Sequence, residues 1–190
     1  MEKALLADEE FNGVDFKEKA PKGTDFENCQ FFNCSFAGVN LTDTSFSECE
    51  FNSCDFSSVK TLKTAFKNVA FNECKLLGVR FENCNAFLLE FRFEGCQIDY
   101  STFYQLKLPK TTFLNCSLKE AEFTETDLTG SQFANCDLSR TVFENSNLKK
   151  VDFTTAKNYS IDLENNRIAK ARFSKDGLSG LLSKYDLIIE

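Results

Sequence analysis

Residues 26–36 read FENCQFFNCSF, a stretch in which phenylalanine returns at every fifth position. The same step of five can be followed from Phe11 to Phe91 and, after a shift of two residues, from Ile98 to Phe173. Of the 33 positions on this path, 29 are Phe, Leu or Ile, and they hold 19 of the 22 phenylalanines. A period of five suits neither the turn of an α-helix nor the unbroken alternation of a strand. The pattern therefore indicates an internal repeat.

In most units the residue two positions before the large apolar residue is small, and all nine cysteines of the chain occupy this position. Local strand alternation points both residues inward, and the other three residues of the unit turn the chain and face water. Four such corners close a square, so each coil takes 20 residues. Stacked coils then align identical residues in columns, as in a solenoid. One column contains Phe11, Phe31, Phe51, Phe71, Phe91, Phe113, Phe133, Phe153 and Phe173, and a second contains Cys34, Cys54, Cys74, Cys96, Cys116 and Cys136.

The closely spaced cysteines could also form a metal site, disulfides or a redox pair. Val, Thr, Ser and Ala alternate with Cys at the same repeat position, so side-chain volume explains the cysteines better than ligand geometry. The chain has no histidine, no Gly-rich phosphate loop and no nucleophile elbow. We therefore expect a protein that is not an enzyme, with no metal, no cofactor and no small-molecule substrate.

Several units, such as CDLSR at residues 136–140, TDLTG at 126–130 and CSLKE at 116–120, resemble the pentapeptide-repeat family. The resemblance covers roughly residues 11–175. It implies an all-β fold, a right-handed quadrilateral β-helix of about eight coils. At a coil spacing of roughly 4.8 Å, the rod would be on the order of 40 Å long.

The period divides the chain into three parts. Residues 1–10 are expected to cap the N-terminal end, residues 11–175 to form the β-helix, and residues 176–190 to form a short helix and strand that cap the C-terminal end and join two copies in a twofold homodimer. A monomeric cap is the alternative. The candidate dimer residues are Leu178, Leu181, Leu182, Tyr185, Leu187, Ile188 and Ile189.

Departures from the repeat are candidates for partner contact, because the regular coils are scaffold. The frame shift lies near residues 87–96, where either Phe91 or Phe93 can be the inward residue. A second irregularity at residues 104–110 contains Pro109. A bulge or a loop that contacts a partner would explain each of them. The candidate contacts are Glu90, Arg92, Phe93, Glu94, Tyr104, Lys107 and Lys110.

The net charge of −7 is spread unevenly, since residues 1–58 hold twelve acidic and four basic side chains whereas residues 59–114 hold five and eight. An acidic surface favours basic partners and argues against direct binding of nucleic acid. The N-terminal sequence does not read as a signal peptide, and no apolar run is long enough to span a bilayer. We expect a cytoplasmic protein that does not act at a membrane.

Within the family, the sequence resembles the quinolone-resistance (Qnr-like) and microcin-immunity proteins of bacteria, in its Phe and Cys richness and in the ending LSGLLSKYDLIIE at residues 178–190. This resemblance implies a dimeric DNA mimic that binds DNA gyrase or topoisomerase IV and protects it from quinolone or microcin-type poisons. The alternative is a pentapeptide-repeat interaction scaffold with an unrelated partner.

Overall fold

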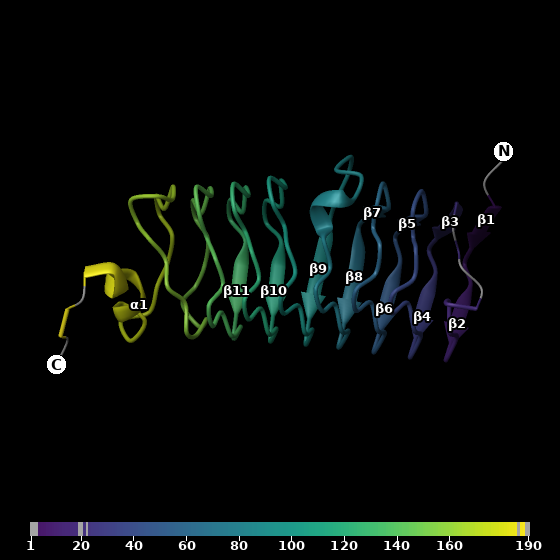
Figure 1. Cartoon of the computed structure of the whole chain (residues 1–190), viewed down its shortest axis with the longest axis horizontal. Helices are drawn as coiled ribbons and strands as arrows, with labels where there is room; N and C mark the ends of the chain where they lie inside the picture. The colour runs from purple at the N-terminus through teal and green to yellow at the C-terminus, as the bar shows by residue number, and fades with distance from the viewer. Residues whose placement is uncertain (1–3, 19–20, 22, 186, 189–190) are drawn as a thin grey trace.

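The chain forms one elongated rod in the computed structural model, with the two termini at opposite ends (Figure 1). The structure describes residues 4–18, 21, 23–185 and 187–188. It is a solenoid of stacked parallel coils, so the fold predicted from the five-residue period is confirmed.

Two parallel sheets run along the rod. The first has four strands in the order β1-β3-β5-β7, and the second has seven in the order β11-β10-β9-β8-β6-β4-β2. The strands of the first sheet are β1 (Ala4–Ala7), β3 (Thr24–Glu27), β5 (Ser45–Ser47) and β7 (Ala65–Lys67). Those of the second are β2 (Glu10–Asn12), β4 (Gln30–Phe32), β6 (Glu50–Asn52), β8 (Val69–Asn72), β9 (Phe91–Glu94), β10 (Thr112–Leu114) and β11 (Gln132–Ala134).

The register repeats every 20 residues, as the sequence columns predict. Phe31 pairs with Phe51, and Phe113 pairs with Phe133. The seven-stranded sheet corresponds to six turns of the solenoid. Isolated parallel bridges from Gln132 to Asp152 and from Asp152 to Arg172 continue the same column for two further steps.

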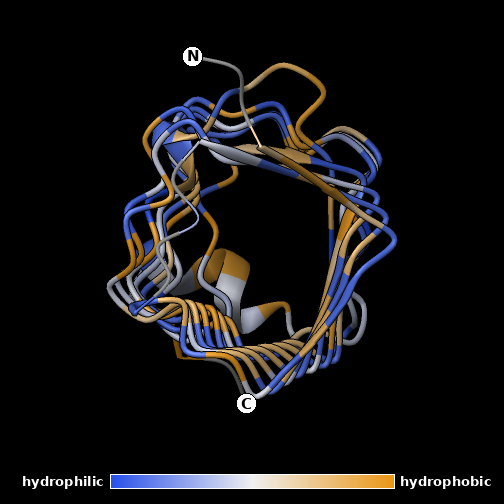
Figure 2. Ribbon diagram, turned by 90° about the vertical axis from the view of Figure 1, so that its right-hand side faces the viewer, coloured by the Kyte–Doolittle hydropathy of each residue, from blue (hydrophilic) through white to orange (hydrophobic). Residues whose placement is uncertain are grey.

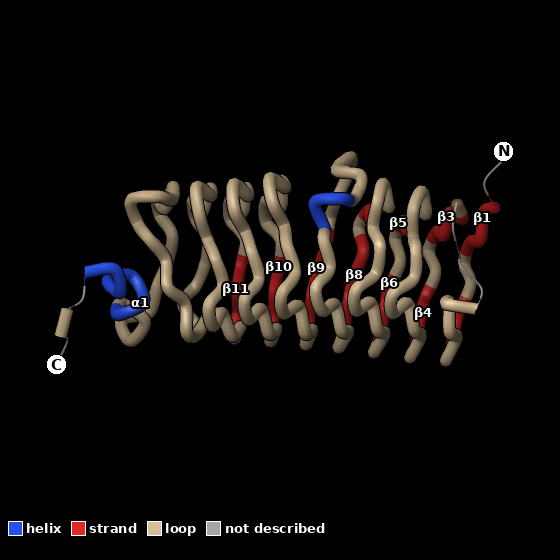
Figure 3. Tube along the Cα trace, in the orientation of Figure 1, coloured by secondary structure: helices blue, strands red, loops and turns tan. Residues whose placement is uncertain are grey.

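Each coil has four sides, which we name by the column of side chains that each side turns inward (Figure 2). Face I contains Phe113, face II contains Leu118, face III contains Phe123 and face IV contains Leu128. The seven-stranded sheet forms face I, and the four-stranded sheet forms the N-terminal half of face IV. Only a short part of each coil is strand, and the rest is turn or isolated bridge (Figure 3).

Stacked phenylalanine rings fill the core. The rings of Phe113 and Phe133 lie 4.8 Å apart with an interplanar angle of 1°, and those of Phe31 and Phe51 lie 4.6 Å apart. Rings on different faces meet edge to face, as Phe113 and Phe123 do at 5.9 Å. Both arrangements are favoured by the quadrupole of the aromatic ring.

Where the small residue two positions before a core residue is Ser, Thr or Cys, its side chain also completes the backbone hydrogen bonding. The hydroxyl of Ser131 donates to the carbonyl oxygen of Leu108 at 2.9 Å and accepts from the backbone N–H of Thr111 at 3.0 Å. The thiol of Cys54 makes the same pair of contacts, at 3.4 Å each, with the carbonyl oxygen of Phe31 and the N–H of Cys34. Cysteine therefore acts here as a small side chain that also satisfies buried polar groups, beyond the apolar filler that the sequence predicts.

The chain turns each corner through a residue with positive φ. Asn28 has φ 51° and Glu48 has φ 53°, and most other corners repeat this left-handed conformation. It carries a steric cost for residues with a Cβ, so the interstrand ladder must maintain it. Glycine at Gly38 and Gly130 adopts the same conformation without that cost.

The frame shift lies before Phe93, which answers the question left open by the sequence. Phe71 pairs with Phe93, so Phe93 occupies the face I column that the sequence path assigns to Phe91. Phe91 is also buried, with its ring 5.5 Å from that of Phe66. It fills the space that Ala86, which is exposed, leaves empty in face IV.

The two ends of the rod differ. The described residues of the expected N-terminal cap include β1, which extends the four-stranded sheet by pairing with β3. At the other end, α1 (Ser179–Leu182) and η2 (Ser183–Tyr185) lie against the last coil. Leu187 and Ile188 form no strand, and Ile189 lies outside the described residues. In the part of the chain described, no helix has the length and apolar character that crossing a membrane requires.

Because its thiols are buried, we expect the protein to have a lower free energy of unfolding at alkaline pH. Burial raises the pKa of Cys49 to about 12, whereas an accessible thiol titrates at 9.0. Between these values the unfolded chain loses the proton and the native chain keeps it, so the free energy of unfolding falls as pH rises above 9. We expect Cys49 alone to contribute a loss of about 1.4 kcal/mol by about pH 10. Urea titrations of the protein and of Cys49→Val, which copies Val69 in the same column, measure this difference. Equal losses in the two proteins would contradict the prediction.

Candidate interaction surface

A projecting loop interrupts face IV at the middle of the rod (Figure 1). It comprises residues 84–90, which follow the short helix η1 (Phe81–Asn83) and precede β9. The backbone of Asn85 donates to Thr64 and that of Glu90 donates to Phe66, so both ends of the loop are tied to the coil before it. At its tip, Phe87 and Leu88 are 68% and 62% exposed.

An acidic corner runs along the N-terminal half of the rod, where face IV meets face I. Its exposed acids lie at the adjoining ends of the face IV and face I strands or between them, as Glu48 does between β5 and β6. Neighbouring coils are about 4.8 Å apart, and Asp8, Glu48 and Glu90 lie two coils from one another in a single column, so these carboxylates recur about every 10 Å. The acidic corner comprises Asp8, Glu9, Glu10, Glu27, Glu48, Glu50 and Glu90.

Asparagine side chains hold two of these carboxylates in place. The Nδ2 of Asn28 donates to the Oδ1 of Asp8 at 2.7 Å, and the Nδ2 of Asn68 donates to an Oε of Glu48. Each asparagine lies one coil further along the same corner column as its acid. It separates the acids without neutralising them, so the row keeps its negative charge.

The predicted contact residues are divided among several parts of the surface. Glu90, Arg92 and Lys110 line a shallow groove of about 380 Å³ together with Glu48 and Glu50 of the acidic corner.

The other predicted contact residues lie elsewhere. Glu94 is exposed on face I, Tyr104 on face III and Lys107 on face IV. Phe93 is fully buried and stacks between Phe71 and Phe113, so its prediction as a contact residue is wrong. Both Phe91 and Phe93 are apolar and were equally eligible for the core.

The C-terminal segment exposes most of the apolar residues expected at a dimer interface. Leu178, Tyr185, Leu187 and Ile188 are 48%, 49%, 59% and 92% exposed. Leu182 is half-buried. Leu181 is only 8% exposed and packs into the core of its own chain, so it is not available to a second copy.

Several contacts attach this segment to the last coil. The backbone N–H of Ile161 donates to Gly180, and the ammonium group of Lys184 lies 2.8 Å from carboxylate oxygens of both Asp162 and Glu164. The hydroxyl of Tyr185 donates to Glu164 at 3.1 Å.

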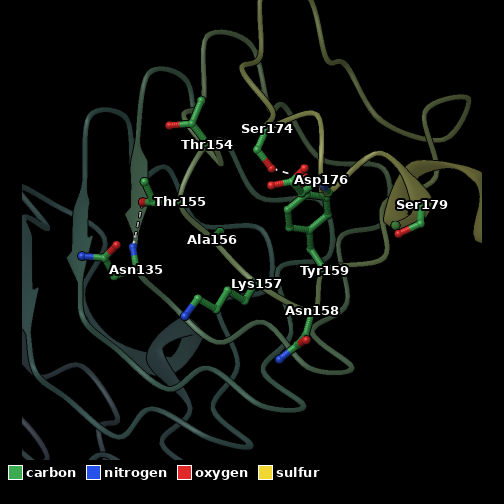
Figure 4. Close-up of a pocket in the computed structure, with 12 residues that line it drawn as sticks. Asn135, Thr154, Thr155, Ala156, Lys157, Asn158, Tyr159, Ser174, Asp176 and Ser179 are labelled. Atoms are coloured by element: carbon green, nitrogen blue, oxygen red, sulfur yellow. Dashed lines mark hydrogen bonds between the residues drawn. The ribbon is translucent and has the colours of Figure 1, made fainter.

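A groove of about 620 Å³ marks the seam between the segment and the rod (Figure 4). Tyr159 forms part of its wall and is 5% exposed, with its ring 5.7 Å from that of Phe173. Asn158 takes the column position that a core residue would have, and its side chain turns outward to donate to Asp137. Tyr159 therefore closes the end of the core, and the segment docks over it.

No group of three or more His, Cys, Asp or Glu side chains in the described part of the chain is arranged to hold a metal ion. The features that could act on another molecule are the row of carboxylates, the apolar loop tip and the exposed apolar residues of the C-terminal segment. Sequence reasoning missed the acidic corner, although the spacing of 40 residues between Glu10 and Glu50, which is two coils, signals it.

Comparison with known proteins supports this description. A model of the pentapeptide repeat region matches residues 44–123 and 107–181, and a model of eight pentapeptide repeats matches residues 24–60. No curated protein matches the sequence.

Solved structures of QnrB1, described as a plasmid-mediated fluoroquinolone resistance protein, share the fold. Two trypsin-treated variants have TM-scores of 0.63 and 0.64 at 18% and 19% identity, and each comparison covers 99% of this chain and 98% of the other. Full-length QnrB1 has a TM-score of 0.50 at 18% identity, covering 97% of this chain and all of its own. At this level of identity, the similarity concerns the fold alone.

Proposed function

The chain belongs to the pentapeptide-repeat family, and from that premise we propose that it is a Qnr-like, non-enzymatic bacterial protein of the cytoplasm that binds DNA gyrase or topoisomerase IV. It acts there as a partial mimic of DNA and protects the enzyme from quinolone or microcin-type poisons. The acidic corner is the observation that carries the proposal. The fluoroquinolone resistance stated for QnrB1 adds support by analogy of fold.

A rigid row of carboxylates suits a groove that normally holds DNA. Lys and Arg side chains in such a groove neutralise phosphates at regular intervals, and the acidic corner presents carboxylates at a regular spacing set by the coils. The acids are held on a scaffold fixed by stacked aromatic rings, so little conformational freedom is lost on binding. Complementary charge also steers the two proteins together.

The proposed assembly is a homodimer joined through the C-terminal segment. The exposed side chains of Leu178, Tyr185, Leu187 and Ile188 support it, because contiguous exposed apolar residues at one end of a soluble rod favour a protein partner. Joining two rods end to end lengthens the mimic beyond one chain.

An unrelated protein partner remains the second candidate function. The projecting loop favours it, because Phe87 and Leu88 offer an apolar contact that a mimic of DNA does not need. A partner recognised mainly through this loop would bind with little dependence on salt.

The proposal predicts that the acidic corner is needed for protection. In a supercoiling assay with a fluoroquinolone, the protein should restore gyrase activity. The triple variant Glu27→Gln, Glu48→Gln, Glu50→Gln should need at least about tenfold more protein for half-maximal protection, a loss of about 1.4 kcal/mol. The substitutions remove three charges and keep nearly the same shape.

A matched control removes three acids from face III, with Glu122→Gln, Glu125→Gln and Glu144→Gln. It should protect as the unchanged protein does. Absence of both rescue and inhibition at micromolar protein would reject the topoisomerase proposal. Loss of protection in the control but not in the first variant would move the contact away from the acidic corner.

A further inference from the structure

The charge of face IV reverses beyond the projecting loop. Six exposed cations occupy its C-terminal half, including the corner where it meets face I. We call this surface the basic half-face. It comprises Lys107, Lys110, Lys149, Lys150, Arg167 and Lys170.

Several other cations in this half of the rod form ion pairs with acids on the adjacent coil. The Nζ of Lys119 lies 3.4 Å from the Oδ2 of Asp137, and the Nη1 of Arg172 lies 2.9 Å from the Oδ2 of Asp152. Arg140 pairs in the same way with Glu120. A solenoid makes such pairing simple, because the residue about 20 positions away is always a lateral neighbour.

The cations of the basic half-face have no such partners. Within the described ranges, none of the six forms an ion pair. Asp127 is the acid among them, and its Oδ1 already accepts from the N–H and the hydroxyl of Thr129 at 2.9 and 2.6 Å. Glu90 borders the N-terminal edge of the basic half-face. The pairing of β9 with β10 places it at the position equivalent to Lys110, one coil earlier.

Two of the cations are stacked directly on each other. Lys150 and Lys170 occupy the same corner position of adjacent coils, where the N–H of Lys150 donates to the carbonyl oxygen of Ala169 at 3.0 Å. Like charges at laterally opposite positions destabilise a sheet. Lys149 adds a third positive charge beside Lys150. The arrangement costs stability in the isolated chain, and a bound polyanion would relieve it.

We propose that the basic half-face binds the phosphate backbone of duplex DNA. Its cations span four coil levels, a length of about 15 Å. Duplex DNA carries one negative charge per about 1.7 Å of its axis, so this length offers enough phosphates for all six cations. Because the six cations are spread along the rod, they suit a linear polyanion. A single phosphate would instead need cations gathered in a concave site.

The overall charge of −7 does not prevent this contact. Apart from Glu90, which borders Lys110, the acidic corner lies in the opposite half of the rod, so DNA would cross only the C-terminal coils. An anionic membrane is a poorer fit, because no exposed aromatic residue lies among the six cations, and the nearby exposed side chains of Phe87 and Leu88 are confined to the tip of the projecting loop. The inference does not depend on a topoisomerase. If the proposed function also holds, the rod would contact the enzyme through its acidic corner and the bound DNA through its basic half-face.

The test uses the full chain alone and a fluorescently labelled duplex of about 20 base pairs, followed by anisotropy at several salt concentrations. We expect binding in the micromolar range at about 50 mM salt, with a log–log salt slope of about −5. The variant Lys149→Gln, Lys150→Gln, Lys170→Gln should bind at least about tenfold more weakly and lower the slope by about 3. The control Lys60→Gln, Lys63→Gln, Lys75→Gln makes the same charge change in the other half of the rod and should bind within about twofold of the unchanged protein.

Three outcomes would overturn the inference. The first is no binding to duplex at low salt. The second is an equal loss of affinity in both triple variants, which would mean a general charge effect. The third is binding to anionic vesicles without binding to DNA. Thermal unfolding of the variants should show them folded and, for the first triple variant, slightly more stable, because the stacked like charges are removed.

Discussion

Replacing Phe113 with alanine is expected to lower the free energy of unfolding by about 3–5 kcal/mol. Phe113 is fully buried, and its ring is stacked between those of Phe93 at 5.1 Å and Phe133 at 4.8 Å. It also meets Phe103 and Phe123 edge to face. Each coil of a solenoid contacts only its neighbours, so a cavity at this level weakens two coil interfaces at once.

The loss is large because a domain of this kind is stable by only about 5–15 kcal/mol. Urea unfolding followed by circular dichroism measures it. Phe113→Leu introduces the residue that the repeat itself uses at Leu118 and should cost about 1 kcal/mol. Phe87→Ala, on the projecting loop, should change stability by less than about 0.5 kcal/mol. A loss below about 1 kcal/mol in Phe113→Ala would contradict the view that the stacked rings hold the coils together.

The regular part of the fold could be predicted because one physical requirement recurs every five residues. A large side chain such as Phe31 must point inward, and a small one such as Cys29 must stand before it. Both requirements are visible in the sequence. The frame shift could not be placed, because Phe91 and Phe93 satisfy the inward requirement equally and the structure buries them both.

The sequence pattern also could not predict the positive φ at the corners. The sequence shows that three residues of each unit turn the chain, but Asn28, Glu48 and Lys150 share no side-chain property that reports a positive φ. The conformation is imposed by the ladder between coils. The intrinsic conformational preference of the corner residue does not determine this positive φ.

The residues of each interaction surface lie together only because of the register between stacked coils. Lys110 and Lys150 are 40 residues apart and face the same way only because two coils separate them. The acids of the acidic corner show the same effect across Asp8, Glu48 and Glu90, the last after the two-residue shift. Net charges of sequence blocks average over all four faces, so they concealed the reversal of sign along face IV.

Gly180→Ala is expected to undock the C-terminal segment. A Cβ at Gly180 would clash with the backbone carbonyl oxygen of Tyr159 and would come within 3.0 Å of its ring. Backbone atoms at this point are held by the hydrogen bond from Ile161 to Gly180, so they cannot move aside. In a helix free of such contacts, the same substitution stabilises by about 1 kcal/mol. Here we expect a loss of about 3 kcal/mol or the release of the segment.

Two measurements follow the segment. Limited trypsin digestion should cleave after Lys184 at least about tenfold faster, because release breaks its ion pairs with Asp162 and Glu164. The solution mass should fall to that of a monomer, since the segment carries the proposed dimer interface. Ser179→Ala, an exposed position of the same helix, should leave both unchanged.

Ile188→Glu separates docking from dimerisation. Ile188 is 92% exposed, so a charge there should halve the solution mass while the rate of cleavage after Lys184 stays low. A dimer that persists in both Gly180→Ala and Ile188→Glu would reject the C-terminal interface. Slow cleavage in Gly180→Ala would show that the close approach of Gly180 to Tyr159 does not decide docking. The two variants together therefore distinguish a segment that only closes the core from one that also joins two rods.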